Sequence, residues 1–343
     1  MRLPTPYAVL VLLLLTGCSE LGLKSFPVQL QSEQPVLGLA YSDTGDRLYV
    51  AGARYLAYGR NGAPLGRRLD VTLSQVAVAG EFVYALTAGT AELRLYDPDG
   101  QCRSCAPDDR IPGKVSAVVA SADGRRVVAA EADEKGTSLW VWRVGVGAVG
   151  ARARGRLLYG NSAGVRHIAL SPDGALLLVV DYVGNVTALD SSSGAQRWRY
   201  ETDEAAGRPF ALFALWNVGA NPLVGLSARG GFEPIGQLDP ATGALTVLAP
   251  EQRDMQFANE TPAVVGTLGG RFLLGRQDVD FQPRVGVLGR YDLERRTFIP
   301  LAERGRFEAI ALSPDGEHLA VSRGSEIDTY DVQDLLDAPP HAP

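Results

Sequence analysis

Short apolar stretches alternate with glycine-bearing turns along this chain, and the same arrangement recurs seven times. The clearest copies are Val165–Val180 (VRHIALSPDGALLLVV) and Phe307–Val321 (FEAIALSPDGEHLAV), and Val36–Val50 and Val115–Ala129 are close relatives. In the Ser-Pro-Asp-Gly turns, proline presets the first turn dihedral and glycine takes the left-handed conformation that closes a hairpin. Each copy therefore predicts two antiparallel strands joined by a tight turn.

The turn glycines follow one another at intervals of 35 to 51 residues, close to the period of about 40–50 residues of a β-propeller with four short strands per blade. A second marker is a strand that ends in an aromatic residue or leucine and usually aspartate, as at Tyr96-Asp97 and Tyr330-Asp331. It follows each hairpin and also occurs seven times. We therefore predict an all-β fold, a seven-bladed β-propeller of four-stranded antiparallel blades.

The last repeat supplies only three strands before the chain becomes rich in aspartate and proline. Its fourth strand is available at the other end of the chain, in Phe26–Gln31 (FPVQLQ). We predict that this N-terminal strand pairs into the last blade, because the pairing removes two open sheet edges. The propeller then spans residues 26–332, and residues 333–343 form a disordered tail.

Two sets of motifs resemble known propeller families. The Ser-Pro-Asp-Gly hairpins resemble YVTN-type and WD-repeat-like propellers, although the Gly-His and Trp-Asp dipeptides of true WD repeats are absent. Thr187–Glu201 and Gly236–Leu248 resemble the outer half of quinoprotein-type repeats. The vicinal cysteine pair and Trp-rich repeats of quinoprotein dehydrogenases are missing, so the resemblance extends to shape and we expect no cofactor.

Composition and charge narrow the function classes. Hydrophobic residues make up 46% of the chain and charged residues 21%, as in a folded body. The net charge of −6 gives no basic footprint for nucleic acid, so we expect no nucleic-acid partner. The three histidines (His167, His318 and His341) are scattered, and we expect no metal site.

The N-terminus has a basic start at Met1-Arg2, an apolar core at Tyr7–Leu15 too short to span a bilayer, and then Leu15-Thr-Gly-Cys18. This arrangement resembles a bacterial lipoprotein signal with its lipobox. The resemblance implies a signal peptide at residues 1–17, acyl chains on Cys18 and a short linker through residue 25. An ordinary secretory signal is the alternative.

Membrane anchoring through these acyl chains would be stable, because several chains hold a protein where one gives only marginal binding. Ser19 follows the lipidated cysteine. By the same resemblance, in a cell with two membranes a residue other than aspartate there permits sorting to the outer membrane, and we expect the protein on its periplasmic side. In a cell with one membrane, the protein would sit on the outer face of that membrane.

Cys102 and Cys105 form a C-x-x-C pair after Tyr96-Asp97. Haem attachment of the common type would need histidine at position 106, which is alanine, and zinc would need two further ligands. An exported protein lies in an oxidising compartment, so we expect a local structural disulfide. A redox pair is the alternative.

Catalytic motifs are sparse, and no G-x-S-x-G, Walker or H-E-x-x-H motif occurs. His167 opens a predicted inner strand beside Arg166, where other copies carry small or aliphatic residues. These two side chains are candidates for the mouth of the central channel. The alternative is a histidine packed within the blade stack.

Longer loops cluster on one predicted face of blades four to six: Thr202–Pro209, Arg229–Pro234, Pro250–Thr261 and Arg276–Arg284. They carry the arginines and aromatic residues expected of a protein-binding patch. The candidate partner-binding residues are Arg208, Arg229, Phe232, Arg253, Phe257, Arg276, Phe281 and Arg284.

The sequence thus favours a lipid-anchored cell-envelope propeller that binds another envelope protein and performs no catalysis. Two alternatives use the channel mouth instead. One is a lactonase-like or other hydrolase, and the other is a carbohydrate or small-ligand binder.

The lipobox interpretation makes a direct prediction. Replacing Cys18 by serine removes the acylated thiol and leaves the propeller unchanged, so the protein should become soluble or remain as uncleaved precursor. Cell fractionation and mass spectrometry of the mature N-terminus measure this. Mature-size Cys18→Ser protein in the membrane fraction would contradict the interpretation.

Overall fold

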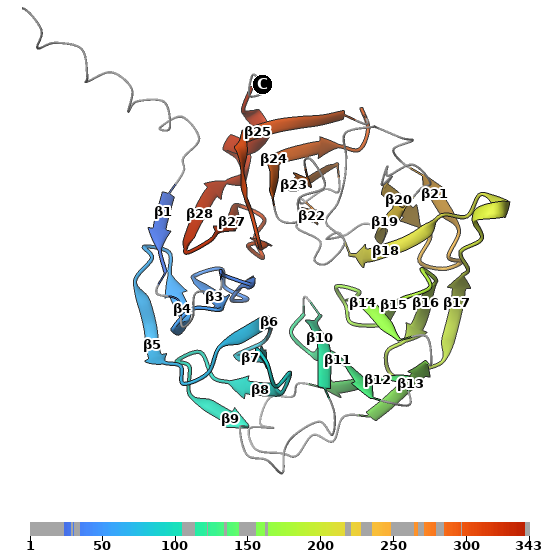
Figure 1. The fold of residues 1–343 in the computed structure, drawn as a ribbon, viewed down its shortest axis with the longest axis horizontal. Helices are drawn as coiled ribbons and strands as arrows, with labels where there is room; N and C mark the ends of the chain where they lie inside the picture. The colour runs from blue at the N-terminus through green and yellow to red at the C-terminus, as the bar shows by residue number, and fades with distance from the viewer. Residues whose placement is uncertain are drawn as a thin grey trace, which may run out of the picture.

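A computed structural model describes residues 24–28, 30, 35–104, 114–121, 123–133, 136–143, 156–161, 164–216, 221–227, 235–247, 264–266, 271–278, 285–295 and 297–339. Within these residues the strands form seven four-stranded antiparallel sheets, arranged as blades around a central axis (Figure 1). The predicted seven-bladed β-propeller is confirmed.

In each blade the strands follow one another outward from the axis, except that the outermost strand of the last blade comes from the N-terminus. Blade 1 consists of β2 (Gly38–Tyr41), β3 (Arg47–Ala51), β4 (Tyr55–Gly59) and β5 (Pro64–Arg68), and blade 2 of β6 (Leu73–Ala79), β7 (Phe82–Thr87), β8 (Leu93–Tyr96) and β9 (Cys102–Ser104). Blade 3 consists of β10 (Lys114–Ala120), β11 (Arg126–Asp133), β12 (Gly136–Arg143) and β13 (Arg156–Asn161), and blade 4 of β14 (Val165–Leu170), β15 (Leu176–Asp181), β16 (Val186–Asp190) and β17 (Gln196–Tyr200). Blade 5 consists of β18 (Phe210–Leu215), β19 (Leu223–Ser227), β20 (Ile235–Leu238) and β21 (Leu245–Val247), and blade 6 of β22 (Val264–Gly266), β23 (Phe272–Asp278), β24 (Val285–Asp292) and β25 (Thr297–Arg306). Blade 7 consists of β26 (Ile310–Leu312), β27 (His318–Arg323), β28 (Glu326–Asp331) and β1 (Lys24–Pro27).

The Ser-Pro-Asp-Gly turns close the inner hairpins as predicted. The Ser171 hydroxyl accepts a hydrogen bond from the Leu176 N–H at 2.8 Å and donates one to Asp173 Oδ1 at 2.6 Å. Gly174 follows with a φ of +68°, which a side chain would strain. A short polar network and one glycine therefore define each turn.

Strand direction gives the disc two distinct faces. Because neighbouring strands in a blade run in opposite directions, the turns between first and second strands, and between third and fourth strands, share one face. We call it the hairpin face; it carries turns such as 171–175. The turns between second and third strands and the links between blades share the other, which we call the link face.

The hydrophobic core lies between blades rather than within them. Between blades 4 and 5, for example, Leu178 and Trp198 pack with Leu226. In the described residues there are seven such clusters, one at each junction of neighbouring blades. Fully burying one such large side chain contributes about 1.5–3 kcal/mol, so each blade depends on both neighbours.

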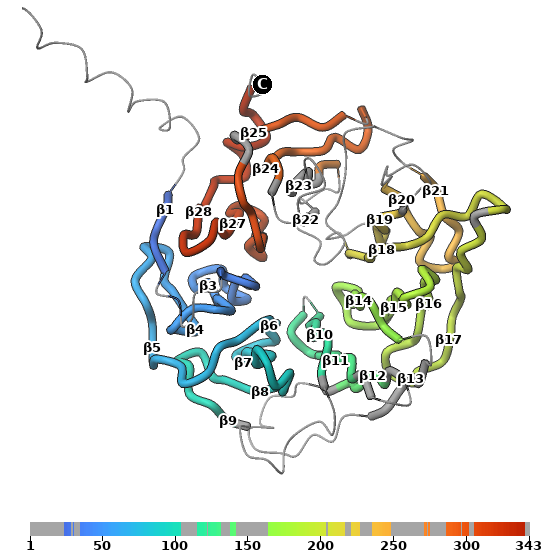
Figure 2. Tube along the Cα trace, in the orientation of Figure 1, coloured from blue at the N-terminus to red at the C-terminus, as the bar shows by residue number. Residues whose placement is uncertain are grey.

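The predicted N-terminal closure is confirmed, with shifted bounds. β1 pairs antiparallel with β28, Lys24 opposite Thr329 and Pro27 opposite Glu326 (Figure 2). The strand covers Lys24–Pro27 rather than Phe26–Gln31 because the chain then crosses to blade 1, where Leu30 bridges Ala53.

The C-terminal residues correct a second boundary. Residues 333–337 of the predicted disordered tail are helical: together with Val332 they form helix α1 (Val332–Asp337) on the hairpin face. Asp331 Oδ1 caps it by accepting from the Gln333 N–H at 2.8 Å, and Val332 and Leu335 are buried at the junction of blades 6 and 7. The same aspartate therefore ends a strand and starts a helix. Among the residues that the structure describes, no helix is long and apolar enough to cross a membrane.

Closure of the ring predicts different effects for two glycines with the same backbone conformation. Gly62 (φ +76°) lies against Phe26 of β1, so an added Cβ would sit 2.5 Å from that ring, whereas Gly207 (φ +73°) has nothing within 4 Å. Gly207→Ala should cost about 1–2 kcal/mol from backbone strain alone. Gly62→Ala should cost about 1–3 kcal/mol more, because it overpacks the closing junction. Denaturant titration measures both; equal losses would show that Phe26 does not matter there.

Candidate functional site

Two large apolar side chains project into solvent from the link face of blade 4. The turn between β15 and β16 has the sequence Asp181-Tyr-Val-Gly-Asn185, in which Tyr182 is 63% exposed and Val183 is 52% exposed. Of the described residues, only Val247 is a further large hydrophobic residue with comparable exposure. Exposed apolar side chains side by side are typical of an interaction site.

Buried polar groups hold this turn in place. The Asp181 side chain, 2% exposed, accepts at Oδ1 from the N–H groups of Val183 and Asn185, both at 2.9 Å. Its Oδ2 accepts from Asn185 Nδ2, also at 2.9 Å. Two exposed side chains thus stand on a turn whose ends are fixed by three hydrogen bonds to the Asp181 side chain.

The turn is also fastened to blade 5. Asn185 Oδ1 accepts from the Thr202 N–H and Gly184 O accepts from the Ala211 N–H, both at 3.0 Å. Gly184 lies against the Phe210 ring, where a Cβ would come within 2.4 Å. Tyr182 and Val183 therefore belong to a rigid junction of two blades.

Arg208 lies on the same face, in the link from blade 4 to blade 5. This link contains a 3-10 turn, η2 (Glu204–Ala206), and a bridge between Asp203 and Arg208. The Arg208 side chain is exposed and its Nη2 lies 3.3 Å from Asp203 Oδ2. We call Tyr182, Val183 and Arg208 the blade 4–5 patch.

The other predicted partner-binding residues are placed less fully. Arg276 was expected in a loop, but it lies within β23 opposite Leu288, because the β23–β24 hairpin continues to Asp278 and Gly286. Six residues lie outside the described residues: Arg229, Phe232, Arg253, Phe257, Phe281 and Arg284.

His167 lies in the inner strand β14, just after a bulge, and its ring meets the Phe213 ring of blade 5 edge-on at 6.4 Å. Its Nδ1 is buried without a hydrogen-bond partner in the described part of the chain. Burial, with a smaller contribution from the Arg166 charge, lowers the pKa of His167 to about 4. A neutral ring between two blades is typical of a packing residue rather than a general base at a channel mouth.

Arg166, the other channel-mouth candidate, is half-buried with its guanidinium carbon 5.6 Å from the Phe210 ring centroid. This contact ties it to the junction that supports the blade 4–5 patch. The described residues hold no cluster of three or more His, Cys, Asp or Glu side chains that could bind a metal ion.

Cys102 is disulfide-bonded, and it begins the outer strand β9 instead of lying in a loop. Cys105 lies outside the described residues, so pairing of these two cysteines stays a prediction. Cys18 also lies outside them.

Comparison with known proteins identifies the fold. No family model and no curated protein matches this chain. A solved structure, the β-propeller domain of Cps50 (Swd1) from Myceliophteria thermophila, is similar, with a TM-score of 0.64 and 10% sequence identity over 90% of this chain and 99% of that one. The chain is a β-propeller. At this level of identity the similarity concerns the fold and not the activity.

The environment of His167 predicts a pH-dependent contribution to stability. Its pKa of about 4, against 6.5 for an unperturbed histidine, means that the unfolded chain binds the proton more tightly. The contribution should be complete above pH 6.5 and be lost as the pH falls to about 4. Blade 2 carries Gln75 at the same place, accepting from the Val118 N–H of blade 3 at 2.9 Å, so His167→Gln is a conservative control.

Denaturant titrations of both proteins between pH 4 and 7 measure this. The difference in unfolding free energy between the wild type and His167→Gln should change over that range in favour of the wild type at higher pH. A difference that does not change with pH would contradict burial of the neutral ring.

Proposed function

We propose that this propeller is a lipid-anchored scaffold of the cell envelope that binds another protein through its link face and does not itself catalyse a reaction. The observation that carries the proposal is the Asp181–Asn185 turn, which holds Tyr182 and Val183 exposed on a rigid support. Interfaces obtain most of their binding energy from a few such anchors, with tyrosine and arginine enriched among them.

The fixed backbone of the turn that carries Tyr182 and Val183 also favours binding. Binding normally costs about 0.5–1.5 kcal/mol for each flexible side chain that becomes ordered. The turn backbone is already fixed by Asp181 and by hydrogen bonds to Thr202 and Ala211. Arg208 lies on the same face, in the neighbouring link, where it pairs with Asp203. The patch thus presents an apolar tip on a fixed backbone to an apolar surface of a partner.

The proposed anchor would lie on the opposite side of the disc. β1 begins at Lys24, whose partner Thr329 lies toward the hairpin-face end of β28, so a linker from Cys18 would have to reach β1 from the hairpin face. At about 3.3 Å per residue, the linker reaches roughly 20 Å and the six-residue strand β15 adds about 20 Å of disc thickness. The patch would face away from the bilayer and meet partners that extend from it or lie beyond it.

Membrane attachment would aid capture of a partner in the same membrane, because confinement raises its effective concentration. In a cell with two membranes, we place the protein at the periplasmic side of the outer membrane, and otherwise at the outer face of the cell membrane. The supporting feature is the lipobox-like sequence that ends at Cys18.

Site-specific photo-crosslinking tests the proposed face. A photoreactive residue at position 182 should give a discrete adduct in intact cells, and Val183→Ser should reduce its yield at least tenfold with an unchanged melting temperature. Val247→Ser is the matched control, because Val247 is 39% exposed on blade 5. Equal yields in Val183→Ser and Val247→Ser, or no adduct from position 182, would contradict the proposal.

A further inference from the structure

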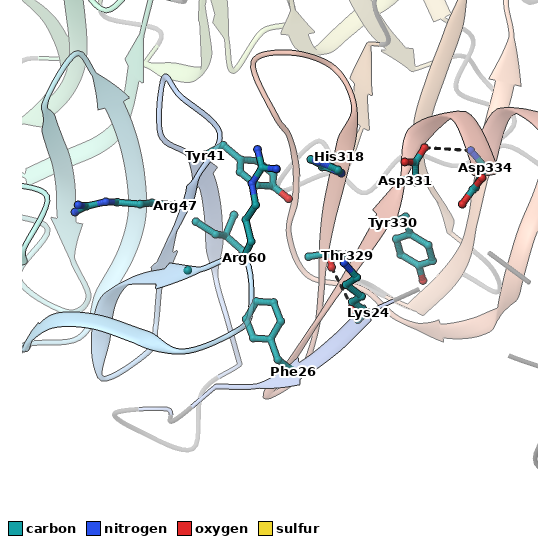
Figure 3. Close-up of a pocket in the computed structure, with 12 residues that line it drawn as sticks. Lys24, Phe26, Tyr41, Arg47, Arg60, His318, Thr329, Tyr330, Asp331 and Asp334 are labelled. Atoms are coloured by element: carbon teal, nitrogen blue, oxygen red, sulfur yellow. Dashed lines mark hydrogen bonds between the residues drawn. The ribbon is translucent and has the colours of Figure 1, made fainter. Parts of the chain in front are cut away.

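A cavity of about 320 Å³ opens on the hairpin face where the last blade meets the first (Figure 3). Its base is apolar and includes the buried side chains of Phe26 and Leu48. Polar groups that line it come from both walls: Tyr41, Arg60, Lys24, His318, Asp331 and Asp334. A volume of this size suits a small ligand.

Blades 1 and 3 each reach the next blade through an arginine at a position where blade 7 has none. In blade 1 the first residue of β3, Arg47, donates from Nη1 to Pro98 O of blade 2 at 3.1 Å. In blade 3 the first residue of β11, Arg126, donates from Nη1 to Gly174 O of blade 4 at 2.7 Å.

Blade 7 has His318 at this position, as the shared turn geometry shows. The N–H groups of Arg47, Arg126 and His318 all donate to the hydroxyl of the serine five residues earlier. Histidine is shorter than arginine, and within the described residues its ring makes no hydrogen bond to blade 1. His318 therefore does not make the bridge to the next blade that Arg47 and Arg126 make at their junctions.

The carbonyl that matches Gly174 O is Gly45 O, and blade 1 occupies it with its own side chain. Arg60 Nε donates to Gly45 O at 3.1 Å, which orients the guanidinium. The two terminal nitrogens of Arg60 make no hydrogen bond in the described part of the chain. They are therefore available to bind an oxyanion in a forked arrangement.

Tyr41 supplies a second donor beside Arg60 (Figure 3). Burial raises the pKa of Tyr41 to about 12, with a small lowering by Arg60 and a small raising by Asp315. The hydroxyl keeps its proton at physiological pH and can donate it in a hydrogen bond. Asp315 is itself engaged, since its Oδ1 accepts from the Glu317 N–H at 3.0 Å.

Opposite charges line the two sides of the cavity without neutralising each other. Arg60 belongs to blade 1, whereas Asp331 and Asp334 lie at the start of α1 against blade 7, and Lys24 opens β1 in blade 7. Among the described residues, none of these four side chains makes an ion pair. The cavity therefore offers a cation and a hydroxyl donor on the blade 1 side, and two carboxylates together with Lys24 on the blade 7 side, a distribution that suits a ligand with both charges.

We propose that this seam pocket binds a small zwitterion, with its oxyanion at Arg60 and Tyr41 and its ammonium group at Asp331 and Asp334. The phosphoethanolamine group has this chemistry, either as a free solute or as the headgroup of a membrane lipid. The interpretation as a lipid headgroup depends on the proposed lipid anchor, which would join β1 at Lys24 on the same face. The pocket itself is independent of the partner-binding patch on the link face.

Calorimetric titration of the purified chain with phosphoethanolamine tests the site. Arg60→Gln and Asp334→Asn should each weaken binding at least tenfold, which is about 1.4 kcal/mol. Inorganic phosphate alone and ethanolamine alone should bind at least tenfold more weakly than the zwitterion. Arg125→Gln and Glu81→Gln are matched controls, because both residues are exposed at hairpin-face turns outside the cavity.

No binding to the wild type, or equal binding to both pocket variants and the controls, would overturn the proposal. Asp334→Asn protects the test against a folding defect, since its side chain makes no hydrogen bond in the described residues. Vesicles of phosphatidylethanolamine, compared with phosphatidylglycerol, then distinguish the sources. Competition by the former alone supports a lipid headgroup, and competition by neither supports a free zwitterion.

Discussion

Burial of sheet faces between neighbouring blades is the constraint on which this structure depends. No blade has a core of its own, because the apolar clusters of the described residues lie at the junctions. A gap in the ring would expose two sheet faces at once, so the last junction matters as much as any other. Phe26 of the N-terminal strand β1 packs with Tyr58 and Ile327 in that junction. The core uses the sheet faces between blades and leaves the turns and links on the two disc faces outside it.

Much of the fold follows from local sequence, because the decisive signals are short. Ser171-Pro-Asp-Gly174 contains its own hydrogen-bonding groups and its own positive-φ residue, so the hairpin can be predicted without knowing its neighbours. The need for an N-terminal strand followed from a count of strands in the last repeat. Its bounds did not, since only the contact between Leu30 and Ala53 of blade 1 shows where the chain leaves β28. The start of α1 was likewise not predicted, because in the sequence an aspartate that ends a strand cannot be distinguished from one that caps a helix, as Asp331 does here.

The candidate sites were harder to predict, because they are formed by contacts between residues of different blades. Loop length directed attention to the link face but favoured long loops, whereas Tyr182 and Val183 project from a tight turn that such reasoning passes over. The signal was present in the sequence: two large apolar residues between an aspartate and Gly184-Asn185. His318 is unremarkable as one residue of a hairpin. It becomes informative only beside Arg47 and Arg126, whose reach across their junctions shows what blade 7 lacks.

Ring closure also has a consequence for when this protein can fold. Lys24 O and the Thr329 hydroxyl are hydrogen-bonded although 305 residues separate them. The first strand to emerge during synthesis must therefore wait for nearly the last one. Contacts of such long sequence separation slow folding, since the entropy of closing the loop must be overcome first. Each hairpin can form early and locally, yet a chain interrupted before β28 retains two unpaired edges. Completion of the ring thus requires that synthesis has proceeded past β28.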